Sequence, residues 1–238
     1  MSDTRPSGLT WTIPGTLRRH PRAFTPLCAT LLTTQLSAVL VGASDVFSSV
    51  LTTIFLLASL LALKASRGLR AAAAVGIVVI ALVRWTSIIA PAPSNDAKIL
   101  AAVLIALYSA LLASHVLAAV LREQHLSLDA VSGAVATYLL VAHAFALCYF
   151  ALELGSRGSI DGIDLKADGG EAVEGWPLSS FLYFSFVTLT TLGYGDISPA
   201  SPVARALVML EATSGQFFFA IFVARLVGVV RGVERSRC

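Results

Sequence analysis

The sequence predicts an all-α membrane protein with six membrane-spanning helices. First, the 238-residue chain is 56% hydrophobic and only 13% charged, whereas an ordinary soluble domain carries about 25% charged residues. Second, it contains apolar runs of about the 20 residues that a helix needs to cross a bilayer. Third, its basic residues gather in alternate segments between these runs. The lipid bilayer is the expected surrounding, and the net charge of +3 gives no reason to expect a nucleic-acid partner.

Six apolar runs are expected to form these helices. They lie at residues 26–43, 46–63, 71–90, 99–121, 130–154 and 203–230. The first run is the least apolar, because Gln35 lies inside it, and the sequence LVGAS at its end would also fit a signal-peptide cleavage site. We expect this run to be retained as a helix, because the arginine-bearing segment before it is long for the start of a signal peptide.

The basic residues predict the orientation of the helices. Lys and Arg are enriched on the cytoplasmic side of membrane proteins. Here they precede the first run, connect the second to the third, and follow the fourth and the sixth: Arg5, Arg18, Arg19, Arg22, Lys64, Arg67, Arg70, Arg122, Arg231, Arg235 and Arg237. This pattern predicts a multi-pass protein of the cell (plasma) membrane with both the N- and C-termini in the cytoplasm.

The segment between the last two runs has a different character. Residues 155–175 contain six glycines and five acidic residues, so we expect a solvated extracytoplasmic loop there. The apolar stretch WPLSSFLYFSFVTLTT follows at 176–191, and Ser179 or Ser180 is expected to cap a helix that begins there. From the cap to Thr190 is about a dozen residues, or roughly 18 Å at 1.5 Å per residue. Such a helix would cross only half of a membrane.

The sequence TTLGYGD at 190–196 gives this helix a reason to end midway. Glycine adopts backbone angles that other residues avoid. Because Gly193 and Gly195 alternate with Leu192 and Tyr194, successive carbonyl groups can turn to the same side. Irregular backbone at membrane depth is tolerated only where it is buried in protein or lines a watery path. Carbonyl oxygens without amide partners would suit a partly dehydrated cation.

In this context residues 178–230 resemble the pore module of potassium channels of the prokaryotic type. That family carries a TVGYG filter loop, and this chain differs at one position, Leu192 for Val, a change that alters the packing behind the filter. The resemblance implies a re-entrant pore helix and a selectivity filter between helices five and six. It implies that K+ is held by the carbonyl groups of Thr191, Leu192, Gly193 and Tyr194 and by the Thr191 hydroxyl, with Gly195 completing the filter. The residues expected to support the filter are Thr190, Tyr183 and Asp196.

The sixth run resembles the inner helix of these channels. Gly215 lies where the family often has a bending glycine, but a small residue there would equally allow close packing of helices, and the sequence leaves both interpretations open. The residues expected to line the pore are spaced three to four apart on one helix face: Gln216, Phe219, Val223 and Val227. Two of them, Val223 and Val227, would close the path by excluding water.

Glu211 is an acid inside the sixth run. Ionisable residues within a membrane are expensive and are functional hypotheses by default. Its helix position lies off the pore-lining face, so we expect Glu211 to face the pore helix and to bond to Thr188 or Ser185. We interpret it as support for the filter rather than as an ion ligand.

These predictions divide the chain into four parts. They are a cytoplasmic N-terminal segment (1–22), a four-helix transmembrane domain (23–125), a potassium channel pore domain (126–230) and a short cytoplasmic tail (231–238). A voltage sensor needs several arginines at regular spacing on the fourth helix, and residues 99–121 contain none. Arg84, in the third run, is expected to extend to the membrane interface.

The sequence thus predicts a channel that conducts K+ passively. Four filter segments are needed to surround one ion and this sequence carries one, so we expect a homotetramer. The alternatives are a non-selective cation channel and a subunit of a coupled potassium transporter. An enzyme is not expected, because the sequence has no paired carboxylates, no nucleophile with a base and no metal-ligand cluster. No cofactor is expected beyond K+ as the permeant ion, and no soluble partner is evident.

Overall fold

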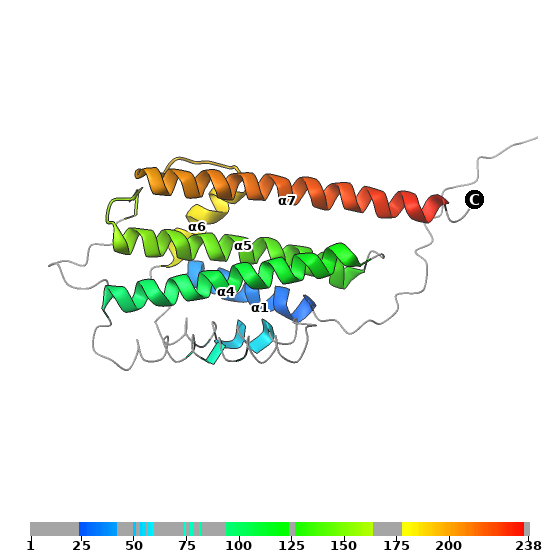
Figure 1. Cartoon of the computed structure of the whole chain (residues 1–238), viewed down its shortest axis with the longest axis horizontal. Coiled ribbons are helices and arrows are strands. Elements are labelled where there is room, and N and C mark those ends of the chain that lie inside the picture. The colour runs from blue at the N-terminus through cyan, green and yellow to red at the C-terminus, as the bar shows by residue number, and fades with distance from the viewer. Residues whose placement is uncertain are drawn as a thin grey trace, which may run out of the picture.

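The computed structural model of the chain describes residues 24–41, 94–123, 127–163 and 178–235, with isolated helical residues between 50 and 81. Three long helices run side by side (Figure 1): α4 (Asn95–Arg122), α5 (Leu128–Gly155) and α7 (Pro202–Arg235). The shorter helices α1 (Phe24–Val41) and α6 (Leu178–Leu189) pack against this group. The N-terminal segment 1–22, Arg84 and most of the predicted runs 46–63 and 71–90 lie outside the described residues.

Four of the six predicted runs coincide with described helices. The runs 26–43, 99–121, 130–154 and 203–230 correspond to α1, α4, α5 and α7. Ser94 and Ser127 begin two of these helices, because their hydroxyl oxygens accept hydrogen bonds from Ala97 N at 3.3 Å and Ala130 N at 3.0 Å. Among the described residues, three helices are long and apolar enough to cross a membrane: Asn95–Arg122, Leu128–Gly155 and Pro202–Arg225.

Buried polar groups fasten α1 to α5. The carboxylate of Asp129, in the first turn of α5, accepts hydrogen bonds from the amides of Phe24 and Thr25 at 2.9 and 3.1 Å. A carboxylate in this place satisfies the free amides and the positive end of the α1 dipole. Further along both helices, Gln35 Nε2 donates to the Leu139 carbonyl at 3.0 Å. The two helices therefore run in the same direction, as expected of the first and fifth of six spans.

Small residues bring α4 and α5 close together along their length. Both helices bury many alanines, and small side chains let helices approach closely: Ala102, Ala106, Ala113, Ala134, Ala136, Ala142 and Ala146. Helix α5 also contacts α1, α6 and α7. It is the centre of the described fold, with Tyr149 and Phe150 fully buried.

A turn and a short two-stranded sheet follow the end of α5. The Glu153 carboxylate is buried and accepts the amides of Gly158 and Ile160 at 2.7 and 2.9 Å, which fixes the turn after the helix. Strand β1 (Ile160–Asp161) then pairs antiparallel with β2 (Ser198–Pro199), just before α7. The pairing of β1 with β2 therefore anchors the backbone directly after the TTLGYGD segment.

Candidate ion-conducting site

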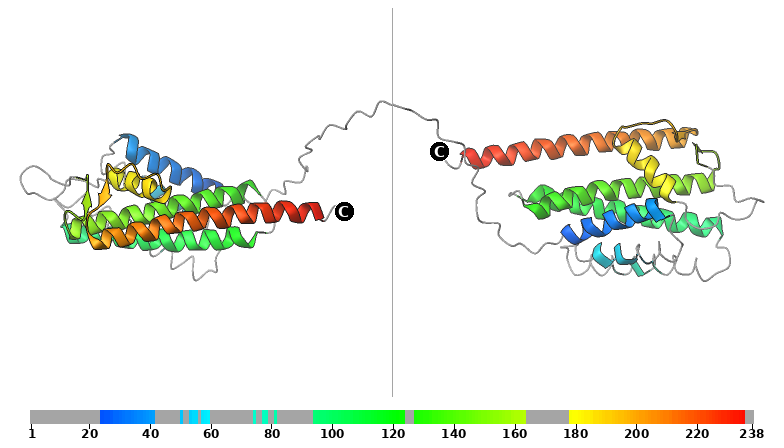
Figure 2. Two further views of the ribbon diagram at one scale, coloured as in Figure 1. Left: turned by 90° about the horizontal axis from the view of Figure 1, so that it is seen from above. Right: turned by 180° about the vertical axis from the view of Figure 1, so that it is seen from behind.

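Helix α6 is the half-length helix that the sequence predicts. It has 12 residues and lies obliquely between α5 and α7, as Figure 2 shows from two further sides. Aromatic pairs hold it against α5: the ring centroids of Phe150 and Phe181 are 5.6 Å apart, and those of Tyr149 and Phe184 are 4.9 Å apart. The predicted cap was wrong, because α6 begins at Leu178 and Ser179 and Ser180 lie within its first turn.

The backbone of the TTLGYGD segment alternates in handedness. Thr191, Gly193 and Gly195 have φ values of 57°, 59° and 83°, while the residues between them do not have positive φ. Positive φ is readily accessible to glycine and uncommon for threonine. Such an alternation allows successive peptide groups to turn in the same sense, as a row of carbonyls on one side would require, and the row itself stays a prediction.

The amides of this segment point back toward the end of α6. Thr191 N donates to the Thr188 carbonyl at 2.9 Å, and the amides of Leu192 and Gly193 both donate to the Val187 carbonyl, at 2.9 and 3.4 Å. Among the residues that the structure describes, no hydrogen bond reaches the carbonyl oxygens of residues 191–195. The C-terminal end of a helix also carries partial negative charge. Both features favour a cation on the carbonyl side.

Three of the residues predicted to support the filter make hydrogen bonds at the two ends of the TTLGYGD segment. The Tyr183 hydroxyl donates to Asp196 Oδ2 at 2.7 Å, which ties the end of the segment to the side of α6. The Thr190 hydroxyl donates to the Phe186 carbonyl at 2.6 Å, which ties its start to the last turn of the same helix. In the single chain the side chains of Leu192 and Tyr194 are 56% and 67% exposed.

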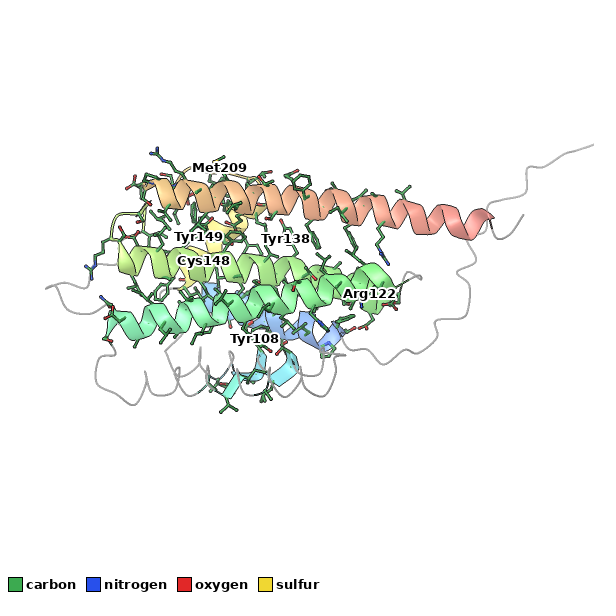
Figure 3. All side chains as sticks on the ribbon, in the orientation of Figure 1. Tyr108, Arg122, Tyr138, Cys148, Tyr149 and Met209 are labelled. Atoms are coloured by element: carbon green, nitrogen blue, oxygen red, sulfur yellow. The ribbon has the colours of Figure 1, made fainter. Side chains whose placement is uncertain are left out.

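Glu211 is completely buried between three helices, with 0% exposure. The Tyr149 hydroxyl of α5 donates to Glu211 Oε2 at 2.6 Å, and Figure 3 shows Tyr149 between α5 and α7. The Ser185 hydroxyl of α6 is hydrogen-bonded to Glu211 Oε1 and lies 2.8 Å from the Ala142 carbonyl. Ser185 was one of the two expected partners, whereas Tyr149 was missed. A tyrosine in an apolar helix usually needs a partner for its hydroxyl when buried, which is the signal that would have drawn attention to it.

Gly215 lies where α7 crosses the end of α6. A Cβ atom at this position would collide with the carbonyl oxygen of Leu189 and approach Leu189 Cδ1 to 3.0 Å. Of the two interpretations of this glycine, the geometry supports close packing, and bending at this point stays a prediction.

Replacing Gly215 by alanine is therefore expected to destabilise the contact between α6 and α7. The carbonyl of Leu189 cannot move without moving the end of α6, and overpacking of this kind costs about 1–3 kcal/mol. We expect a lower unfolding temperature in detergent and weaker ion flux. The control is Gly155→Ala, whose Cβ would meet Ile99 Cδ1 at an ordinary 3.8 Å. Equal stability of the two variants would contradict the packing argument.

The predicted pore-lining residues share one open face of α7. Gln216 is exposed, and Phe219, Val223 and Val227 are 66%, 41% and 46% exposed in the single chain. An adjacent side of the helix, with Ala204, Glu211 and Gly215, is buried against the rest of the chain. The predicted pore-lining residues can therefore face the predicted ion path or contact other copies of the chain.

Arg225 connects α7 to α4, a contact that no pattern in the sequence indicated. Its guanidinium donates to the carbonyls of Leu121 and Glu123, at the end of α4. A cation in this place satisfies free carbonyls and complements the negative end of the helix dipole. This contact anchors α7 between Val223 and Val227, the two residues predicted to close the path.

The comparisons with known proteins concern this part of the chain. Residues 135–231 match a family model described as "Ion channel". A two pore potassium channel c from Oryza sativa subsp. japonica is 33% identical over 97 residues, 40% of this chain and 20% of that protein. Two-pore potassium channel 5 from Arabidopsis thaliana is 32% identical over 69 residues, 29% of this chain and 17% of that protein.

The chain spans about a fifth of the length of these relatives, and no solved structure matches it significantly. The family match begins inside α5 and continues through α6, the TTLGYGD segment and almost all of α7. Residues 135–231 are thus similar to an ion channel domain, and potassium channels are among its relatives.

Proposed function

We propose that this protein is a potassium-selective channel that conducts K+ passively across the cell membrane. The observation that carries the proposal is the alternating backbone at Thr191, Gly193 and Gly195. The amides of Thr191, Leu192 and Gly193 are bonded to the end of α6, and within the described part of the chain no hydrogen bond reaches the carbonyls of residues 191–195. Among the described residues no group of three or more His, Cys, Asp or Glu side chains could hold a metal ion. Backbone oxygens are therefore the ligands that this site offers.

The channel is proposed to be a homotetramer. One segment presents a single row of carbonyls, which cannot surround an ion, whereas four copies around a common axis can. The exposed face of α7 would then line the path below the filter. This assembly has six spans per subunit and both termini in the cytoplasm. The common direction of α1 and α5 supports the number of spans, and the distribution of Lys and Arg supports the orientation.

In this proposal K+ is held by the carbonyls of Thr191, Leu192, Gly193 and Tyr194 and by the Thr191 hydroxyl. Asp196 and Tyr183 fix the outer mouth, and Glu211 fixes the helix behind it. Oxygen atoms replace the water that the ion loses, so entry requires little net dehydration cost. The chain acts as a channel and catalyses no reaction.

A non-selective cation channel is the second candidate. It is favoured by Leu192, which replaces the valine of the potassium-channel motif with a larger side chain directly beside the carbonyl row. Its side chain is exposed in the single chain, so its neighbours in an assembly would decide how firmly the filter is held.

The direct test is ion flux through the purified full chain reconstituted in liposomes. We expect K+ to flow down its gradient and Na+ to flow far more slowly, with a particle mass in detergent corresponding to four copies. Equal K+ and Na+ flux would favour the non-selective channel. K+ movement against its own gradient, driven by a second ion, would favour the coupled transporter instead.

A further inference from the structure

We infer that the carboxamide of Gln216 forms, with the Thr191 hydroxyl, an additional cation-binding position at the inner end of the filter, and that it sets how readily ions enter from that side. This inference rests on the proposed function and deepens it. Gln216 would be an ion-binding residue that acts at the entrance and not within the row of carbonyls.

The first observation is a direct contact between the two side chains. Gln216 Nε2 donates to Thr191 Oγ1 at 3.3 Å, across 25 positions of the sequence. The donated hydrogen uses one lone pair of the threonine oxygen, and the second stays available. The threonine hydroxyl is thereby oriented by the glutamine, at the residue where the alternating backbone begins.

The second observation is that the position of Gln216 is firmly fixed. Its neighbour Gly215 is buried and touches the last residue of α6, Leu189, without room for a Cβ atom. The backbone of Gln216 is therefore held beside the inner end of the TTLGYGD segment. Because one end of the carboxamide is bonded to Thr191, its carbonyl oxygen Oε1 has a restricted set of directions.

The third observation concerns the chemistry of the surrounding face. After Gln216, the exposed face of α7 continues with Phe219, Val223 and Val227, all apolar. An ion moving along this face would meet no oxygen from these side chains. The oxygen of Gln216 is the first protein oxygen that this face offers next to the filter, and neutral amide oxygens are ligands that hard cations accept.

Four copies would place four carboxamides and four hydroxyls around the axis. The oxygen atoms of these groups would replace some of the water molecules that coordinate a monovalent cation before it reaches the carbonyls of the filter. The effect depends on the side from which the ion comes, because Gln216 lies at one end only. It should change the concentration of K+ at which current saturates from that side, and should leave the preference of the carbonyl row for K+ over Na+ in place.

The test compares Gln216→Met and Gln216→Glu in single-channel recordings of the full chain in planar bilayers. Methionine keeps an unbranched chain and removes both polar atoms, so half-saturation by K+ should rise about three- to tenfold on one face only, the factor that one neutral hydrogen bond is worth. Glutamate keeps an oxygen and adds negative charge, so half-saturation on that face should fall. K+/Na+ selectivity should be unchanged in both variants.

The matched control is Met209→Leu, at a residue of α7 that is 71% exposed and lies outside the predicted pore-lining set. Its half-saturation values should equal those of the wild type. Wild-type half-saturation in both Gln216 variants, or an equal shift on both faces, would overturn the inference. If methionine prevents assembly, the glutamate variant alone decides, because its expected shift has the opposite sign from general damage. A wild-type chain that passes no K+ at all would instead overturn the proposed function.

Discussion

Replacing Gly193 by alanine is expected to abolish the discrimination between K+ and Na+. Gly193 has a φ of 59°, and holding an L-residue in this left-handed region costs roughly 1–2 kcal/mol. A Cβ atom would meet nothing within 4 Å in the single chain, so the strain lies in the backbone angle. The four copies of a tetramer would together store about four times this amount. The strain is relieved when the peptide rotates, and its carbonyl then leaves the ion path.

The measurement is the reversal potential with K+ on one side of a bilayer and Na+ on the other. The wild type should reverse far from zero, and Gly193→Ala should reverse close to zero or carry no current. Gly158→Ala is the control, because Gly158 has a φ of 79°, lies in the turn after α5 and leaves an added Cβ atom with nothing within 4 Å. It carries the same kind of backbone strain away from the carbonyls. Loss of selectivity in both variants, or in neither, would contradict the assigned role of Gly193.

The features that the sequence predicted well are those determined by neighbouring residues. A helix of α6's length follows from an apolar stretch that ends at a glycine-containing segment, and both are local. The alternation at Gly193 and Gly195 likewise follows from the spacing of the glycines. The ends of α4 and α5 differ from the predicted runs by a few residues, because Ser94 and Ser127 cap these helices upstream of the apolar residues.

The features that the sequence did not predict depend on contacts between distant segments. Tyr149 bonds to a residue 62 positions away, and Arg225 bonds to carbonyls more than 100 positions away. Carbonyl acceptors are present at every residue, so no pattern in the sequence distinguishes the two that Arg225 selects. Ser185 was foreseen because the helix position of Glu211, off the predicted pore-lining face, directed its side chain toward the pore helix.

The other large effect is expected at Glu211, where the hydrogen bonds determine which substitution is tolerated. Three contacts each require a hydrogen: Tyr149 with Glu211, Ser185 with Glu211, and Ser185 with the Ala142 carbonyl. The two hydroxyl groups supply one hydrogen each. We infer that the third comes from Glu211, as a neutral carboxylic acid that donates to Ser185 and accepts from Tyr149.

Glutamine reproduces this pattern, since its amide nitrogen donates and its oxygen accepts. Glu211→Gln should therefore keep the stability and flux of the wild type. Glu211→Ala leaves the buried Tyr149 hydroxyl without an acceptor, which costs roughly 1–3 kcal/mol, and opens a void that adds to this loss. Because the cluster joins α5, α6 and α7, the alanine variant should also lose conduction through a displaced pore helix.

The second buried glutamate provides a control of opposite sign. Glu153 accepts backbone amides on both carboxylate oxygens, from Gly158 at 2.7 Å and Ile160 at 2.9 Å. Glutamine has only one acceptor oxygen. In Glu153→Gln one of the two backbone N–H groups would therefore face the NH2 group of the glutamine, which should destabilise the turn. Thermal unfolding in detergent, measured together with K+ flux, should therefore rank Glu211→Gln with the wild type and Glu153→Gln below it. If Glu211→Gln instead loses as much stability as Glu211→Ala, both oxygens of Glu211 act as acceptors, and the carboxyl group is charged within the helix cluster.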